Sequence, residues 1–163
     1  MKVFQLLTLL LIFGLLLTTN SQAQKIYNPD ADAKKDIEHA IQSAKKSDKH
    51  VFLQIGGNWC PWCIKFHNFI KNNEELNAQM NVGFEVVKVN YDENNHQTEL
   101  LKELDFPQRF GFPVFVILDG NGNRIHTQNS ALLEQGDGYD KDKVLHFLTN
   151  WSPPALSPAF YSN

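Results

Sequence analysis

The sequence predicts an α/β fold in which a central mixed β-sheet carries helices on both faces. Helix and strand patterns alternate through the first half of the chain, which is typical of a sheet with helical crossovers. The second half contains two strand patterns joined by a tight turn, which adds an antiparallel pair. With 163 residues, 42% of them hydrophobic and 20% charged, the chain has the composition of one globular domain. It fits neither a disordered chain nor a multispanning membrane protein.

Residues 1–23 have the pattern of a secretory signal peptide. Lys2 precedes an apolar run over residues 3–17, and Ser21 and Ala23 place small side chains three and one positions before a cut after Ala23. We therefore expect cleavage there and export across the inner membrane into the periplasm. The alternative is an uncleaved leader that holds the protein at the membrane. No cysteine lies near the cut to accept a lipid.

The part of the chain after the leader is expected to form one domain over residues 28–151, followed by a non-helical tail over residues 152–163. The leader contains Lys2 and no acidic residue, so its removal changes the formal net charge from −3 to −4. Acidic and basic residues are interspersed along the rest of the chain. This distribution argues against a nucleic-acid partner.

The first expected helix follows Asn28-Pro29-Asp30, which is a helix-start signal, and apolar residues recur at helical spacing from residue 33 to residue 44. An apolar run over residues 51–55 predicts a mostly buried strand that ends at two glycines. The second helix is expected to begin at Cys60. Pro61 then occupies the first turn, where its missing N–H costs no hydrogen bond.

Each later element has apolar periodicity and a start or stop signal of its own. These elements are a short helix capped by Asn73 that ends near Met80, a second central strand over residues 84–89, a helix capped by Asn95 that stops at Phe106-Pro107, a buried strand over residues 114–118, its hairpin partner over residues 123–128, and a last helix capped by Asp140. The turn Asp119-Gly120-Asn121-Gly122 joins the hairpin.

Cys60 and Cys63 are the two cysteines of the chain. A disulfide between residues three apart closes a very small loop and stabilises a fold weakly, so redox chemistry explains the pair better than a structural role. Cys60 follows a buried strand and begins a helix, where unpaired N–H groups and the helix dipole lower the pKa of a thiol. Cys63 lies one turn later and can reach back to resolve a mixed disulfide. We therefore predict Cys60 as the nucleophile and Cys63 as the resolving cysteine.

The segment Trp59-Cys60-Pro61-Trp62-Cys63 resembles the Trp-Cys-x-x-Cys active site of the thioredoxin superfamily. Gly111-Phe112-Pro113, ahead of a buried strand, looks like the loop that carries a cis-proline in that superfamily. The resemblance covers about residues 50–151 and is closest to the exported thioredoxin-like branch.

This resemblance implies a thioredoxin-like fold and thiol-disulfide oxidoreductase activity on protein substrates. It further implies that Pro113 is cis, that Phe112 presents its backbone to substrate chains, and that Trp59 and Trp62 flank the site. No cofactor is implied beyond the Cys60–Cys63 pair, and a separate protein must donate or accept electrons. Reductase or general thiol exchange is preferred, because the few residues between the leader and the domain cannot supply the dimerisation module that isomerases of this kind use.

Gln54 departs from the superfamily pattern, and this departure affects the expected role of Lys88. Both residues are expected to tune the dithiol. Gln54 lies six residues before Cys60, where typical thioredoxins carry a buried aspartate. An amide cannot take a proton from Cys63, so water or another group is expected to do so. Lys88 lies in the segment that resembles the one with a lysine beneath the site. If Lys88 is charged and lies close to Cys63, its positive charge favours the Cys63 thiolate. The alternative is that the Lys88 side chain points to solvent, since lysine is rarely buried.

The residues between the cysteines, Pro61 and Trp62, are uncharged, whereas strong exported oxidants of the superfamily carry a histidine there. The couple is therefore expected to be less oxidising than theirs. A potential of about −120 mV in a redox titration against glutathione would contradict this expectation.

Two other functions stay open from the sequence. Cys60, Cys63 and His67 fall on one stripe of the expected helix, and two thiolates with an imidazole suit an exported Cu(I) or zinc carrier. The simpler interpretation of His67 is a helix residue that binds no ligand, and no resident metal is expected. The other alternative is a redox-inactive thioredoxin-like binding module.

Overall fold

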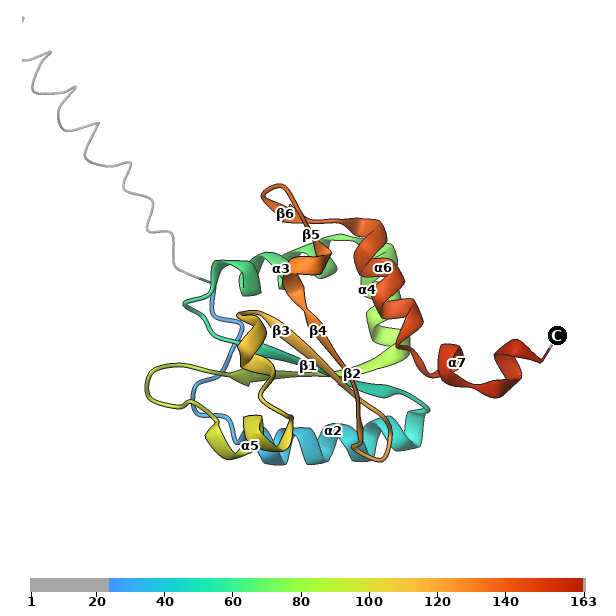
Figure 1. The fold of residues 1–163 in the computed structure, drawn as a ribbon, viewed down its shortest axis with the longest axis horizontal. Coiled ribbons are helices and arrows are strands. Elements are labelled where there is room, and N and C mark those ends of the chain that lie inside the picture. Colours follow the sequence, from blue (N-terminus) through green and yellow to red (C-terminus); the bar gives the residue numbers. More distant parts are fainter. Residues whose placement is uncertain (1–23, 163) are drawn as a thin grey trace, which may run out of the picture.

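A four-stranded mixed sheet in the order β2-β1-β3-β4 forms the centre of the molecule (Figure 1). β1 (His50–Gly56) pairs in parallel with β2 (Phe84–Asn90) and antiparallel with β3 (Val114–Leu118), which pairs antiparallel with β4 (Arg124–Asn129). The predicted mixed sheet is confirmed. β2 lies at its edge, however, which corrects the prediction of a second central strand. Unlike β1 and β3, which are buried at every position, β2 keeps partly exposed residues, as an edge strand can.

The structure is a computed structural model that describes residues 24–162. The predicted signal peptide over residues 1–23 lies outside the described residues. Over the described range, no helix combines the length and the apolar character needed to cross a membrane.

Helices cover both faces of the sheet, as predicted (Figure 1). On one face lie α2 (Ala33–Ser47) and α5 (Thr98–Glu103), and on the other lie α3 (Pro61–Asn72), α4 (Glu74–Gly83) and α6 (Lys141–Asn150). This arrangement leaves the carboxyl end of β1 and the start of α3 at one end of the sheet.

Two apolar cores form because successive residues of a strand point to opposite faces. Leu53 of β1 and Val116 of β3 belong to an aliphatic core beneath α2 and α5. Phe52, Phe115 and Ile117 belong to a second, aromatic core beneath α3, α4 and α6. The end of β1 that leads to Cys60 is therefore supported by packed residues on both faces of the sheet.

Two helices begin later than predicted, and in neither of them does the predicted residue cap the first turn. α2 begins at Ala33, where Asp32 accepts a hydrogen bond from the backbone N–H of Lys35. α5 begins at Thr98 after Gln97, which has a left-handed backbone and makes no side-chain cap bond. Asn95, the predicted cap, instead accepts a hydrogen bond from the backbone N–H of Gln97.

The C-terminal region contains short elements that the sequence patterns did not predict. β5 (Glu134–Gln135) and β6 (Gly138–Tyr139) form a small hairpin that is too short to show a period. The tail was predicted to be non-helical, but it forms α7 (Pro153–Leu156) and the 3₁₀ helix η3 (Pro158–Tyr161). Its prolines lie in the first turns, where a missing N–H is tolerated. The other 3₁₀ helices are η1 (Pro107–Phe110) and η2 (Ser130–Leu133).

Candidate active site

Cys60 lies at the junction between β1 and α3, where it is the N-cap residue of the helix. Its backbone is extended, and Pro61 occupies the first turn as predicted. The Cys60 sulfur accepts a hydrogen bond from the backbone N–H of Cys63 at 3.2 Å. This bond satisfies one of the N–H groups that the first turn of a helix leaves unpaired. The junction therefore favours a negative charge on this sulfur, with the helix dipole acting in the same direction.

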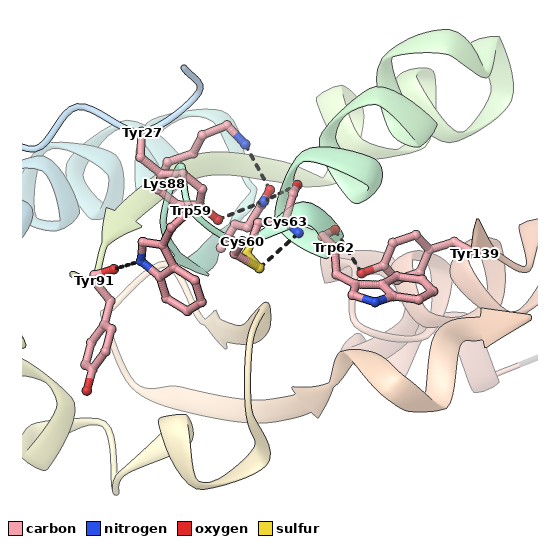
Figure 2. The surroundings of a disulfide bond; sticks show 9 residues. Tyr27, Trp59, Cys60, Trp62, Cys63, Lys88, Tyr91 and Tyr139 are labelled. Carbon is pink, nitrogen blue, oxygen red and sulfur yellow. Dashed lines mark hydrogen bonds between the residues drawn. A yellow bond between two sulfur atoms is a disulfide. The ribbon is translucent and has the colours of Figure 1, made fainter. Parts of the chain in front are cut away.

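A disulfide joins Cys60 to Cys63, with a Cα–Cα distance of 5.3 Å (Figure 2). Both cysteines are buried, with exposed fractions of 2% and 0%. The backbone of β1 approaches this pair closely at Gly56. A Cβ atom at position 56 would overlap the sulfur of Cys63 and lie 3.0 Å from the hydroxyl oxygen of Tyr27. Only glycine leaves room for the dithiol at this position.

A polar group lies beneath the disulfide, where Gln54 connects three partners. Gln54 is 2% exposed, and its Nε2 donates to the hydroxyl of Tyr27 at 2.9 Å and to the backbone oxygen of Cys63 at 3.1 Å. Its Oε1 accepts from Nζ of Lys88 at 2.9 Å. Lys88 therefore points inward to Gln54, and the alternative that it simply points to solvent is wrong. Burial lowers the pKa of Lys88 to about 8.

Aromatic side chains lie on two sides of the disulfide (Figure 2). On one side, Nε1 of Trp59 donates to the backbone oxygen of Tyr91 at 2.7 Å. The centre of the Phe112 ring lies 5.5 Å from the centre of the Trp59 ring and 4.6 Å from the centre of the Tyr91 ring. On the other side, Trp62 packs edge-on against Tyr139, whose hydroxyl donates to the Trp62 backbone oxygen at 3.2 Å. Trp59 stays 55% exposed, so it presents a large apolar surface beside the dithiol.

The loop before β3 lies beside the dithiol, because β3 pairs directly with β1. The peptide bond between Phe112 and Pro113 is cis, as the resemblance implied. Pro113 is buried, and Phe112 packs against the cluster formed by Tyr27, Cys60 and Cys63. The structure thus brings together the CxxC segment and the Phe112-Pro113 loop, which are about fifty residues apart in the sequence.

His67 lies on the cavity side of α3. It lines a cavity of about 200 Å³ together with Gln54, Lys71 and Lys88. Burial lowers the pKa of His67, and the positive charges of Lys88 and Lys71 lower it further. Within residues 24–162, no group of three or more His, Cys, Asp or Glu side chains is placed to hold a metal ion. The described residues therefore do not assemble Cys60, Cys63 and His67 into a metal site.

Two residues that build the site were not identified from the sequence. Tyr27 precedes the expected domain start, yet it is 3% exposed and lies beneath the dithiol. Asn58, in the turn before Cys60, holds the chain at Ile26 and Tyr27 in place. Its Oδ1 accepts hydrogen bonds from the backbone N–H groups of Ile26 and Tyr27 at 2.8 and 3.0 Å. Its Nδ2 donates to the backbone oxygen of Tyr27 at 2.9 Å. No periodic signal marks either residue, because their partners lie about thirty residues away.

Comparisons with known proteins show similarity in sequence and in fold. A family model described as a thioredoxin-like domain matches residues 37–134. The disulfide bond reductase DsbH of Chlamydia pneumoniae is 29% identical over 92 residues, which cover 53% of this chain and 55% of that protein. The chain thus spans about half the length of this curated relative.

Two solved structures share the fold. A disulphide isomerase from Xylella fastidiosa Temecula1 aligns with a TM-score of 0.70 at 23% identity, over 79% of this chain and 98% of its own. The C-terminal domain of Neisseria meningitidis DsbD, in the oxidised form, aligns with a TM-score of 0.51 at 23% identity, over 72% of this chain and 95% of its own. At this level of identity, the likeness concerns the arrangement of the strands and helices.

Proposed function

The chain belongs to the thioredoxin-like domain family, and from this premise we propose that it is an exported thiol-disulfide oxidoreductase that acts on protein disulfides. One observation carries the proposal: the sulfur of Cys60 caps the first turn of α3 and is bonded to Cys63, which lies one turn later. A thiolate at Cys60 is stabilised there by the helix start, and the resolving thiol is already within bonding distance.

The proposed reaction begins with the reduced dithiol. The Cys60 thiolate attacks one sulfur of a substrate disulfide, so a Cys60–substrate bond forms and the substrate disulfide breaks. The departing substrate sulfur leaves with the electron pair and takes a proton from solvent. Cys63 then loses its proton and attacks Cys60, which forms the Cys60–Cys63 disulfide and releases the second substrate thiol. Two electrons have passed to the substrate, and another protein must return two electrons to the disulfide.

The residues around the disulfide are proposed to contact the substrate chain. Trp59 offers exposed aromatic surface on one side, and Trp62 flanks the other. The Phe112 side chain packs against Trp59 and against the cluster that contains Cys60, and its backbone at the cis bond to Pro113 is proposed to receive the substrate chain. A polypeptide that docks against this loop would bring its own disulfide to Cys60.

The proposed compartment is the periplasm, with residues 1–23 as a cleaved leader and residues 28–151 as the catalytic domain. The signal-peptide pattern of residues 1–23 supports export to a compartment where disulfides persist. The mass of the protein recovered from a periplasmic extract checks this part, and we expect a chain that starts at Gln24. Recovery of the full-length chain from the membrane fraction would instead indicate an uncleaved anchor.

Reduction of insulin tests the activity most simply. The wild-type protein, supplied with dithiothreitol, should accelerate insulin precipitation, and Cys60→Ser should abolish this acceleration because it removes the nucleophile. Cys63→Ser should leave a mixed disulfide with insulin that can be isolated, because no resolving thiol remains. Equal turnover by Cys60→Ser and wild type, or no turnover by the wild type, would contradict the proposal.

A further inference from the structure

A series of hydrogen-bond donors runs from Lys88 toward the buried sulfur of Cys63. Nζ of Lys88 donates to Oε1 of Gln54, and Nε2 of Gln54 donates to the hydroxyl of Tyr27, each at 2.9 Å. Lys88 and Tyr27, the two ends of this series, are labelled in Figure 2. A tyrosine hydroxyl that accepts a hydrogen bond still has its own hydrogen to donate. Each donor polarises the next, so the series strengthens the last O–H as a donor.

The Tyr27 hydroxyl and the Cys63 sulfur face the same point above Gly56. A Cβ atom placed on that glycine would lie 3.0 Å from the hydroxyl oxygen and still closer to the sulfur. Tyr27, Cys60 and Cys63 form one buried cluster. Among the described residues, no hydrogen bond joins the hydroxyl to this sulfur in the oxidised form. A thiolate is a stronger acceptor than a neutral sulfur, because its charge assists the bond.

We infer that the Tyr27 hydroxyl donates a hydrogen bond to the Cys63 sulfur when that sulfur is negatively charged, with Gln54 and Lys88 orienting and polarising the hydroxyl. This inference rests on the proposed function and assigns to it a group that stabilises the resolving thiolate. Tyr27 lies before the segment that the family model matches, and its place is fixed by Asn58.

The step that Tyr27 assists is the resolution of the mixed disulfide. The Cys63 thiolate attacks the Cys60 sulfur, the Cys60–Cys63 bond forms, and the bond between Cys60 and the substrate breaks. The electron pair leaves with the substrate sulfur, and the proton lost by Cys63 reaches that sulfur through solvent. Tyr27 keeps its own proton throughout, since burial raises the pKa of its phenol far above the ordinary value. It therefore acts as a donor to the charge and does not act as a base.

Other charged groups lie near Lys88, at the start of this series. Lys88 lines the cavity shared with His67 and Lys71 of α3. It also lines a groove on the opposite side with Asp36 and His39 of α2 and with Glu85 of its own strand. A variant that removes only the Tyr27 hydroxyl leaves these groups in place, so their effects cancel in a comparison with the wild type.

The test is an NMR titration with pH of the reduced mature protein, which is the whole chain from Gln24 onward. The protein is labelled with ¹³C at the cysteine Cβ atoms. Tyr27→Phe should move the ionisation midpoint of Cys63 upward by about one pH unit, the size expected when a thiolate loses one hydrogen bond. Tyr139→Phe is the matched control, because it removes a partly buried hydroxyl that bonds to the Trp62 backbone on the far side of the disulfide. It should leave the midpoint of Cys63 unchanged.

A second measurement needs no variant. With ¹³C at the Cζ atoms of tyrosine, the Tyr27 signal should shift with the same midpoint as Cys63, whereas the Tyr139 signal should not. An unshifted Cys63 midpoint in Tyr27→Phe, or a Tyr27 signal that ignores the ionisation of Cys63, would overturn the inference. If insulin turnover is normal in the wild type, such a result leaves the proposed function standing. If the wild type lacks turnover, the proposed function fails and the titration still reports on Tyr27.

Discussion

Gly56 is the residue at which the site tolerates least change, because its missing side chain makes room for the sulfur of Cys63. Gly56→Ala should lower the free energy of unfolding of the oxidised protein by about 1–3 kcal/mol, as is typical of an overpacked core. Denaturant unfolding measures this loss. Gly138→Ala is the matched control, since a Cβ atom there meets nothing within 4 Å. Equal stabilities of the two variants would show that position 56 is not crowded.

Lys88 makes the stability of the protein depend on pH. Its pKa is lowered by burial to about 8 in the folded protein, while an unfolded lysine keeps a pKa of about 10.4. Between these values the unfolded chain binds more protons than the folded one, so the free energy of unfolding rises with pH.

This effect is isolated by comparing the free energy of unfolding of the wild type with that of Lys88→Met, with the disulfide intact in both. The stability of the wild type relative to the variant should rise by about 2 kcal/mol between pH 8 and pH 10. Denaturant unfolding of both proteins at a series of pH values gives the difference in their free energies of unfolding as a function of pH. The contributions of the other titrating groups cancel in this difference. A flat or falling difference would mean that Lys88 is not desolvated in the folded protein.

Among the elements, the backbone of the segment before α2 is held to the site by the side chain of Asn58. Asn58 bonds to three backbone groups of Ile26 and Tyr27 and thereby places Tyr27 beneath the disulfide. The turn that contains Asn58 also leads into Cys60, so the same few residues position the nucleophile and the buried tyrosine.

Asn58→Ala should release this segment. We expect a loss of about 1–3 kcal/mol in the free energy of unfolding, because three buried or partly buried backbone groups lose their partner. Hydrogen exchange of the Ile26 and Tyr27 amides should accelerate, while the amides of β1 exchange at unchanged rates relative to global unfolding. Asn58→Asp keeps the acceptor oxygen, so it should show a smaller effect. Unchanged exchange at Tyr27 in Asn58→Ala would contradict this role.

Across the whole molecule, the sequence predicted those features that depend on local patterns. The buried strands β1 and β3, the hairpin turn and the Cys60 start of α3 each carry their signal within a few residues. The edge position of β2 and the attachment of Tyr27 depend on pairings between distant segments, which periodicity does not contain. The tail helices could not be predicted, because a proline in the first turn of a helix looks the same in the sequence as a proline that ends one.

The same division applies to the site. Cys60, Cys63 and the Trp59, Trp62 and Pro113 surroundings follow from the motif and its resemblance to a known family. The inward direction of Lys88 could not be derived, because it depends on the buried amide of Gln54 on the neighbouring strand. The separation of the aromatic core beneath α3 from the aliphatic core beneath α2 could not be predicted, because it depends on which face of the sheet each helix covers.

The central claim is that the fold places the Cys60 sulfur at a helix start that stabilises its thiolate. The pH dependence of the iodoacetamide alkylation of Cys60, followed by mass spectrometry on the reduced protein, tests it most directly. The midpoint reports ionisation whether or not burial slows the reaction. We predict a midpoint at least one pH unit below the ordinary thiol value of about 8.5. A midpoint at or above that value would contradict the account.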